Sequence, residues 1–265
     1  MAERVWDRFL TEQDKAHIAV SRPKSDYGFG AKAAILSIDN YRAAVGDQPE
    51  PLLSSAALGL GGPDIEADIR AIYQAPTTAF WSLTKPPTQA SGPGEGWLSW
   101  EAEQFCRQAL EAEPVCLELL WSAHPVWASE AGYELLDLRG AFLSQLLAPA
   151  YSAHALARFK ELDEAEPEQS ERRWARAAYL LHLLMDGAAL LRAGDTTDAV
   201  GEHRERLIGL RTGQETWDAV DAWRLELQRD LEEASAATFL PPRPDIDRVN
   251  AWLAHTRRRE VDRAS

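Results

Sequence analysis

The sequence predicts an α+β fold, in which a short region that contains strands precedes a mainly helical region. Two apolar runs, at residues 33–38 and 69–74, have the length and composition of buried strands. From residue 129 onward, apolar residues recur at intervals of three and four, which is the period of an amphipathic α-helix. A chain of 265 residues is long enough to form one or two domains around a sizeable core.

Helix boundaries follow from capping residues and helix breakers. Ser99 is a good N-cap for a helix that runs to residue 113, and Pro114 suits the first turn of a helix that reaches residue 121. Gly194 ends the long helix that begins at residue 170, and a proline-rich run separates the last two helices. The helices expected in chain order cover residues 1–20, 99–113, 114–121, 129–147, 149–162, 170–193, 199–210, 216–237 and 245–259, with a short helix that ends at residue 83.

The overall composition limits the classes of function. The net charge of −14 argues against a general nucleic-acid-binding coat, although it leaves room for a small basic site. We expect a cytoplasmic protein without membrane contact, because the sequence has no apolar run long enough for a membrane span and no signal-peptide pattern. Cys106 and Cys116 are expected to be small buried side chains in a reducing compartment. The basic run at 257–259 is expected to be a solvated end.

Three carboxylates stand at every second position just before the apolar run at 69–74. Asp64, Glu66 and Asp68 would share one face of an extended chain, where carboxylate oxygens could hold Mg²⁺ together with substrate phosphates. Of the three, Glu66 and Asp68 are the favoured ligands, whereas Asp64 is expected to be a turn residue after Pro63. Upstream, a turn at Ser54 and Ser55 could offer backbone N–H groups and hydroxyls to those phosphates. This arrangement is typical of a phosphoryl- or nucleotidyl-transfer site. The alternative is an acidic loop that contacts solvent alone.

Several short motifs from residue 52 onward together resemble one family. They are residues 54–73, 80–87, 105–106, 117–121, 138–139, 141–144, 190–194 and 201–204, with Glu101, Pro114, Tyr151, His154 and Phe159. Together these residues resemble a family of predicted nucleotidyltransferases in the DNA polymerase β superfamily. Each motif alone has little specificity, whereas their order along the chain is specific.

This resemblance implies a small mixed-sheet nucleotidyltransferase-like core at residues 53–122, followed by a mainly α-helical C-terminal domain at 123–265. It also implies Mg²⁺ as cofactor and a nucleoside triphosphate as substrate, while the acceptor could be RNA, a protein or a small molecule. A third carboxylate is expected from a later strand, with Glu95 and Glu101 as candidates. The site residues that the resemblance implies are Glu66 and Asp68 as catalytic metal ligands, Ser54, Ser55 and Arg70 as phosphate contacts, and Tyr179 and His182 as contacts to the base or ribose.

Several positions depart from the family pattern and leave a second class of function open. Ser54 stands where the family has glycine, and Glu66 stands where it has the shorter aspartate. Ala71 also stands where the family has glycine. In the long helix, Ala175 and Tyr179 stand in place of two polar side chains that the family uses towards the nucleotide. These changes favour, as the alternative to an active enzyme, a non-catalytic descendant that binds a nucleotide or a protein.

Three arginines near the start of the long helix have two interpretations. Arg172, Arg173 and Arg176 could form a patch that faces phosphates. They could instead balance the acidic linker at residues 163–168, and this second interpretation is favoured.

Residues 4–12, 27–30, 35–39 and 46–51 resemble the opening of isochorismatase-like cysteine hydrolases, in particular the carbamoylsarcosine-amidase type. In that family the aspartate after the first strand is one of three catalytic groups, and Asp39 matches it. The catalytic lysine and cysteine have no counterparts, since Cys106 and Cys116 lie in a different context. Residues 1–52 are therefore expected to be an N-terminal extension of hydrolase-like origin, and a cysteine hydrolase is the third functional class.

Overall fold

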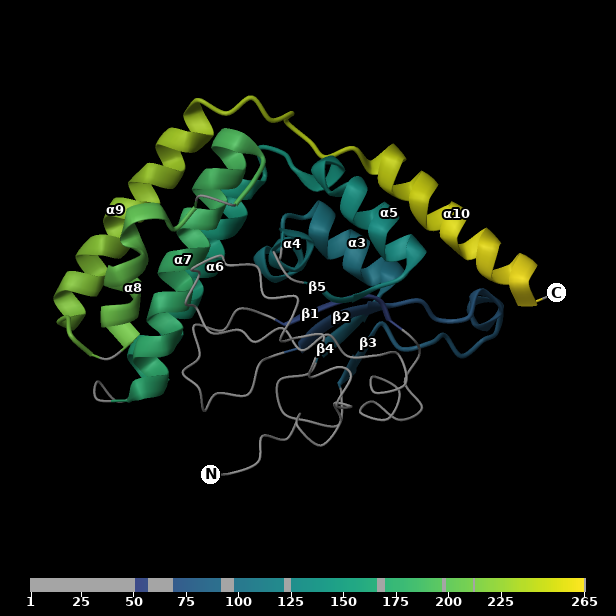
Figure 1. Ribbon diagram of the computed structural model, residues 1–265, viewed down its shortest axis with the longest axis horizontal. Helices are drawn as coiled ribbons and strands as arrows, with labels where there is room; N and C mark the ends of the chain where they lie inside the picture. Colours follow the sequence, from purple (N-terminus) through teal and green to yellow (C-terminus); the bar gives the residue numbers. More distant parts are fainter. Residues whose placement is uncertain are drawn as a thin grey trace, which may run out of the picture. The chain divides into compact units, whose positions relative to one another are not determined.

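The computed structural model describes residues 51–56, 69–91, 98–121, 125–165, 170–196, 199–211 and 213–264 (Figure 1). These residues form an α+β fold that is mainly helical and contains one small mixed sheet. The chain divides into two compact units. The sheet unit comprises the described parts of Met1–Cys106, Ser122–Leu138 and Asn250–Ser265, and the helical unit comprises those of Arg107–Trp121 and Arg139–Val249. The domain boundaries at residues 52 and 122 stay a prediction.

The sheet has five strands in the order β3-β4-β2-β1-β5. Three of its neighbouring pairs are antiparallel, namely β3–β4, β2–β1 and β1–β5, whereas β2 and β4 are parallel. The run predicted as a strand at 69–74 is confirmed as β2, and the run at 33–38 lies outside the described residues. The strand bounds are Pro51–Ala56 for β1, Ile69–Tyr73 for β2, Gln89–Ser91 for β3, Leu98–Glu101 for β4 and Pro125–Ala128 for β5.

Two local predictions are wrong because strand pairing overrides them. Ser54 and Ser55 lie in β1, opposite Ala71 and Arg70 of β2, and not in a turn. Ser99 lies in β4, so the following helix α3 begins at Ala102 and runs to Leu110. A serine is compatible with a turn or an N-cap, but partners distant in the sequence decide whether the backbone is extended.

The other helices of the sheet unit are α5 (Glu130–Asp137) and most of α10 (Ile246–Ala264), together with the 3₁₀ helix η2 (Thr77–Trp81). Ser129 caps α5, because its hydroxyl oxygen accepts a hydrogen bond from the Gly132 N–H over 3.1 Å. The helix predicted from residue 129 to 147 is nevertheless shorter: it ends at Asp137, and the 3₁₀ helix η3 (Arg139–Phe142) follows. The indole N–H of Trp252 on α10 donates to the Ala131 carbonyl on α5 over 3.3 Å.

The long helix α7 (Glu171–Ala193) is the centre of the helical unit and packs against α6, α8 and α9 (Figure 1). Leu181, Leu184 and Leu191 on α7 are almost wholly buried, and each such side chain stabilises the fold by roughly 1.5–3 kcal/mol. Gly194 ends α7 in the left-handed conformation with φ of 70°, as predicted. The other helices are α4 (Pro114–Trp121), α6 (Leu147–Ala165), α8 (Arg204–Arg211) and α9 (Trp217–Ala236), with the 3₁₀ helix η4 (Gly201–His203) before α8.

None of the helices that the structure describes is long and apolar enough to cross a lipid bilayer.

A close contact between α6 and α7 makes Gly187 sensitive to added volume. A Cβ atom at residue 187 would lie 2.7 Å from Cδ1 of Tyr151, whose ring is buried, and 3.1 Å from Cδ1 of Leu231. We therefore expect Gly187→Ala to lower the free energy of unfolding in urea, because overpacking costs about 1–3 kcal/mol and alanine regains only about 1 kcal/mol of helix propensity.

The matched control is Gly140→Ala, at an exposed position where the new Cβ would meet no heavy atom within 4 Å. This control should leave the unfolding free energy unchanged or slightly higher. A Gly187→Ala protein as stable as the wild type would contradict the packing described for α6 and α7.

Candidate functional site

The carboxylates predicted to bind metal lie outside the described residues, but the described strands begin next to them. Glu66 and Asp68 precede Ile69, the first residue of β2, and Glu95 precedes Leu98, the first residue of β4. Asp39 and Asp64 are also outside the described residues.

The parallel pairing of β2 with β4 sets which ends of these strands meet. Arg70 is opposite Leu98, and Tyr73 is opposite Glu101. The amino ends of the two strands therefore lie at the same edge of the sheet, which we call the amino edge. In the sequence, Asp68 directly precedes the first residue of β2, and Glu95 stands three residues before the first residue of β4.

The predicted phosphate contacts belong to the same region of the backbone. Strand β1 runs antiparallel to β2, so its carboxyl end reaches the amino edge. Ser55 is opposite Arg70, and Ser54 is opposite Ala71. Arg70 is half-buried in β2 and follows Asp68 by two residues. The turn predicted for Ser54 and Ser55 is therefore wrong, and both serines belong to the strand whose carboxyl end lies at the amino edge.

Glu101 lies at the end of β4 that is opposite the amino edge. Its backbone is opposite Tyr73, and a strand rise of about 3.3 Å per residue separates Tyr73 from Ile69 by about 13 Å. Of the two acidic candidates for the third carboxylate, only Glu95 precedes β4 at the amino edge.

Both cysteines are buried, as predicted. Burial, together with the nearby Glu101 carboxylate, raises the pKa of the Cys106 thiol to about 12. The Sγ of Cys116 lies 3.7 Å from the side-chain oxygen of Gln108 in the interior. Because a nucleophilic cysteine needs an accessible thiolate, the burial and the raised pKa of Cys106 argue against the cysteine-hydrolase class.

Tyr179 and His182 belong to what we call the α4–α7 polar cluster, which consists of Glu118, Tyr179, His182 and Asp186. The Tyr179 hydroxyl donates a 2.8 Å hydrogen bond to Oε2 of Glu118 on α4. The Nδ1 of His182 lies 3.4 Å from Oδ2 of Asp186, one turn further along α7. The structure therefore brings the two predicted nucleotide contacts together, but both are in contact with acidic side chains of the helical unit.

Burial controls the protonation of this cluster. It lowers the pKa of His182, although the Glu118 carboxylate acts in the opposite direction. It raises the pKa of Asp186 well above the usual aspartate value. Burial thus favours the neutral forms of His182 and Asp186. A cluster with two carboxyl groups and an uncharged histidine suits the hydrogen-bonding groups of a base or ribose better than the negative charges of a triphosphate.

Sequence reasoning gave no role to Glu118 or Asp186. Asp186 follows His182 by four residues on the same helix, so its proximity could have been inferred from helical spacing. Glu118 could not, because its contact with Tyr179 joins two helices that are far apart in the sequence.

Arg173 is tied to an acidic side chain and to an aromatic ring. Its Nη2 lies 2.7 Å from Oδ1 of Asp163, and its guanidinium lies 3.8 Å from the centre of the Trp217 ring. Asp163 belongs to the acidic segment at 163–168, so the interpretation that Arg173 balances this segment is confirmed. Arg176 is exposed on α7, and the side chain of Arg172 is outside the described residues.

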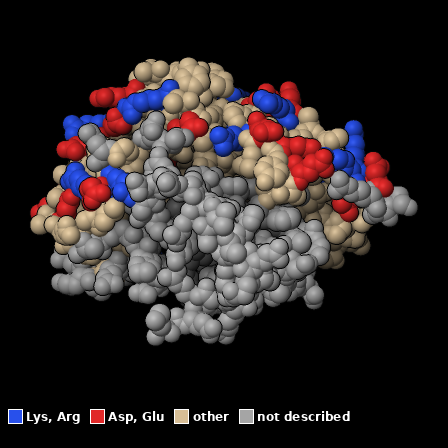
Figure 2. All heavy atoms as spheres, in the orientation of Figure 1, with Lys and Arg blue, Asp and Glu red and all other residues tan. Residues whose placement is uncertain are grey.

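Acidic and basic side chains of the described residues are interspersed on the face shown in Figure 2. This pattern agrees with the net charge of −14, which favours local basic contacts over a broad basic surface.

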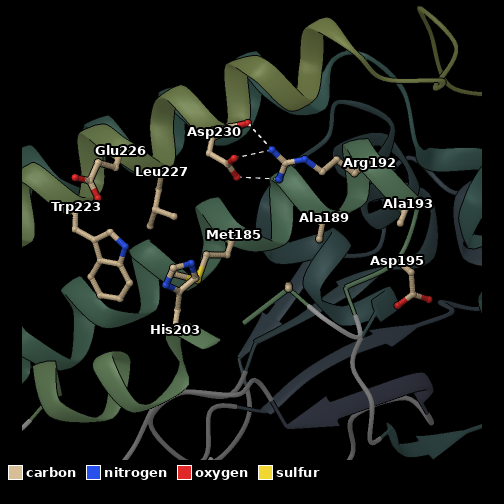
Figure 3. Close-up of a pocket in the computed structure, with 11 residues that line it drawn as sticks. Met185, Ala189, Arg192, Ala193, Asp195, His203, Trp223, Glu226, Leu227 and Asp230 are labelled. Carbon is tan, nitrogen blue, oxygen red and sulfur yellow. Dashed lines mark hydrogen bonds and ion pairs between the residues drawn. The ribbon is translucent and has the colours of Figure 1, made fainter. Parts of the chain in front are cut away.

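A pocket of about 690 Å³ lies between α7 and α9 in the helical unit (Figure 3). At its wall, Arg192 on α7 contacts both carboxylate oxygens of Asp230 on α9, at 2.6 and 2.9 Å. The hydrogen bonds from Arg192 are the main reason that the pKa of Asp230 lies below its usual value. The ring of His203 lies 5.7 Å from that of Trp223. Among the described lining residues of this pocket there is no site residue predicted from the sequence.

Over the residues that the structure describes, no group of three or more His, Cys, Asp or Glu side chains could hold a metal ion. The predicted ligands Glu66 and Asp68 lie outside these residues.

The sequence profile of the RNA repair pathway DNA polymerase beta family matches residues 53–255. The chain belongs to this family. Its function is therefore, in coarse terms, of the nucleotidyltransferase type. Comparison with curated proteins and with solved structures gave no match. The resemblance to the DNA polymerase β superfamily is confirmed. Residues 1–51 lie before the matched region, so their resemblance to a hydrolase stays a prediction.

Asp186 and Asp230 should influence stability with opposite pH dependence. The raised pKa of Asp186 means that its contribution to stability is fully present below pH 3.8 and is lost as the pH rises through the folded-state pKa. The lowered pKa of Asp230 means that its contribution is present above pH 3.8 and is lost as the pH falls through the folded-state pKa. We therefore expect Asp186→Asn to gain stability relative to the wild type with rising pH, and Asp230→Asn to lose it.

Urea unfolding of both variants and the wild type over a range of pH measures this difference, and each variant is the control for the other. Parallel pH profiles for the two variants would contradict the assignment of Asp186 as a buried acid without a compensating charge.

Proposed function

We propose that this protein is a Mg²⁺-dependent nucleotidyltransferase that transfers a nucleotidyl group from a nucleoside triphosphate to an acceptor. The observation that supports the proposal is the parallel pairing of β2 with β4, two strands that Asp68 and Glu95 closely precede in the sequence. Membership of a polymerase β-like family supports the same reaction class.

In this proposal Glu66, Asp68 and Glu95 hold Mg²⁺, since carboxylate oxygens are the protein ligands that this ion prefers. When bound, Mg²⁺ offsets charge on the phosphates and aligns the attacking and leaving oxygens. Glu95 replaces Glu101 as the third carboxylate, because Glu101 stands at the far end of β4. Glu66 is one methylene longer than aspartate, so the metal would sit further from the backbone at this position than at Asp68.

The remaining site residues bind and orient the substrate. Arg70 on β2 would supply positive charge to the triphosphate, and Ser55 stands opposite it on β1. Tyr179 and His182 would contact the base or the ribose, since the acids of the α4–α7 polar cluster make it unsuited to phosphates. Glu118 would fix the Tyr179 hydroxyl during this contact.

RNA is the proposed acceptor. The family description places its members in an RNA repair pathway, and an RNA end supplies the hydroxyl that a nucleotidyltransferase needs. The net charge of −14 means that the contact would be confined to a small part of the surface, with a modest dependence on salt concentration.

A non-catalytic nucleotide-binding descendant is the second candidate function. Ser54 and Ala71 stand where the family has glycines, and both lie within paired strands. Ala71 is fully buried in β2, which leaves a methyl group where a glycine would allow closer approach of the backbone. These replacements favour binding without turnover.

Incubation with each of four α-labelled nucleoside triphosphates, Mg²⁺ or Mn²⁺ and a short RNA tests the proposal. We expect the wild type to label the RNA, and Asp68→Asn to lower the rate by more than about 100-fold, because it removes a direct metal ligand. Asp64→Asn is the matched control, since Asp64 is predicted to be a turn residue after Pro63, and it should label RNA at nearly the wild-type rate.

Absence of labelling, together with absence of metal-dependent triphosphate binding, would contradict the proposed function. Triphosphate binding that needs no metal and gives no product would support the second candidate.

A further inference from the structure

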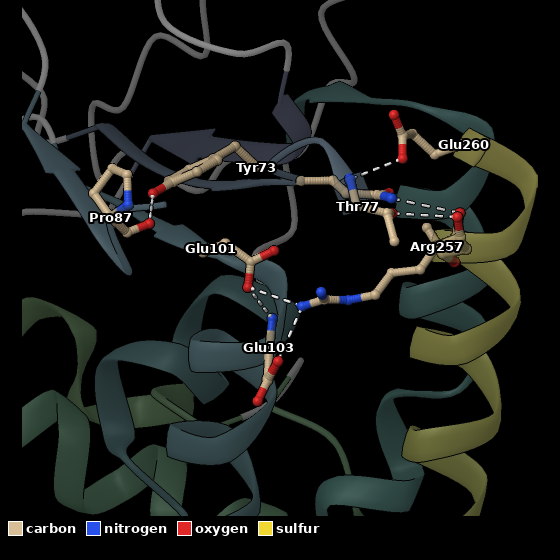
Figure 4. Close-up of polar contacts among 9 residues, drawn as sticks. Tyr73, Thr77, Pro87, Glu101, Glu103, Arg257 and Glu260 are labelled. Carbon is tan, nitrogen blue, oxygen red and sulfur yellow. Dashed lines mark hydrogen bonds and ion pairs between the residues drawn. The ribbon is translucent and has the colours of Figure 1, made fainter. Parts of the chain in front are cut away.

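The last turns of α10 contact the segments at the carboxyl ends of β2 and β4, and Arg257 makes several of these contacts (Figure 4). Residues 256–264 follow the end of the family match at residue 255. The sequence predicted that the basic run at 257–259 is a solvated end, and this is wrong for Arg257 and Arg259, because both are paired with acids. These turns therefore follow the matched region and make specific contacts with residues inside it.

Arg257 contacts the chain that follows β4. Its Nη2 lies 3.0 Å from Oε2 of Glu103 and 3.4 Å from Oε2 of Glu101. The same oxygen of Glu101 accepts a 2.8 Å hydrogen bond from the Glu103 backbone N–H, at the start of α3. The guanidinium also lies 4.0 Å from the centre of the Phe80 ring on η2, within cation–π distance.

The same turn of α10 contacts the chain that follows β2. The backbone N–H of Thr77 donates to Oε2 of Glu260 over 2.9 Å, and the Thr77 hydroxyl donates to the Arg257 carbonyl over 3.3 Å. The Gln74 side-chain amide donates to the Thr256 carbonyl over 3.5 Å. One helical turn thus bridges the segments that leave two neighbouring parallel strands.

The charge of Glu101 depends on this bridge. The Glu101 side chain is 3 % exposed and that of Arg257 is 16 % exposed. Burial raises the pKa of Glu101, while the Glu103 N–H and the Arg257 guanidinium lower it. Removal of Arg257 would leave a buried carboxylate without its cation, which is strongly destabilising at this position.

We propose that the turn of α10 centred on Arg257 is a brace that fixes β2 and β4 relative to each other, and that Arg257 is a positioning residue for the groups at the amino edge. The second part rests on the proposed function, in which Glu66, Asp68 and Glu95, which precede β2 and β4 in the sequence, hold the metal. Both strands are short, so a movement of their carboxyl ends relative to each other also moves their amino ends relative to each other.

Arg259 supplies a matched control within the same helix. Its Nη1 and Nη2 each lie 2.7 Å from a carboxylate oxygen of Glu134 on α5, and Glu130 is 3.8 Å away. Arg259 therefore makes a comparable ion pair that joins α10 to a helix and not to the ends of the parallel strands.

Hydrogen exchange of the full chain measures the brace directly. In Arg257→Gln, we expect the amides of β2 and β4 to exchange about tenfold faster than in the wild type, while those of α7 and α9 are unchanged. Arg257→Lys should give an intermediate rate, because it keeps the charge but loses the planar contact with Phe80. Arg259→Gln should leave β2 and β4 unchanged.

The double variant Glu101→Gln, Arg257→Gln covers the case in which Arg257→Gln fails to fold. It removes the buried unpaired charge but does not restore the bridge, so β2 and β4 should still exchange about tenfold faster. Exchange within about twofold of the wild type in this variant, or the same increase in Arg259→Gln, would overturn the brace.

Nucleotidyl transfer by the same variants tests the positioning role. We expect Arg257→Gln to lower kcat with little change in the KM for the triphosphate, and Arg257→Lys to restore part of kcat. Wild-type kcat in Arg257→Gln would overturn this role. Absence of transfer in the wild type would instead contradict the proposed function, and with it the positioning role, while the exchange rates would still decide whether the brace exists.

Discussion

The parallel pairing of β2 with β4 is the constraint on which the rest of the account depends. Parallel neighbours require the chain to leave one end of the sheet and return to the other, so residues 74–97 connect the carboxyl end of β2 to the amino end of β4. This connection gives the two ends of the sheet different roles. Asp68 and Glu95 precede the two strands in the sequence, whereas Arg257 pairs with Glu101 and Glu103 at the opposite end of β4.

Buried carboxyl groups appear in both units, and their surroundings distinguish them. Glu101 in the sheet unit has a cation and a backbone N–H as partners. Asp186 in the helical unit is paired with a histidine whose own pKa is lowered by burial. The first arrangement can hold a charged carboxylate between structural elements, whereas the second favours neutral groups that can exchange hydrogen bonds with a ligand.

Local signals in the sequence predicted the features that depend on adjacent residues. Pro114 begins α4 and Gly194 ends α7, because capping preferences act within one turn of a helix. The failures involve partners that are distant in the sequence. Ser99 has the side chain of an N-cap, but it is part of β4 because its backbone pairs with Ala71.

For the candidate site, the sequence predicted the family, which is confirmed over residues 53–255. The predicted ligands Glu66 and Asp68 lie outside the described residues and stay a prediction. Neither spacing nor composition could show that Glu101 is paired opposite Tyr73, at the carboxyl end of β2, because that depends on strand direction. The contacts of Arg257 were also out of reach, since a basic run near the end of a chain is usually solvated.

The direct test of the account is the affinity for Mn²⁺ in the presence of a nucleoside triphosphate, measured by electron paramagnetic resonance for the wild type, Glu95→Gln and Glu101→Gln. If the parallel pairing places the third carboxylate at the amino edge, Glu95→Gln should bind Mn²⁺ at least about tenfold more weakly, while Glu101→Gln should bind it nearly as well as the wild type. Weaker binding in Glu101→Gln and wild-type binding in Glu95→Gln would contradict the account.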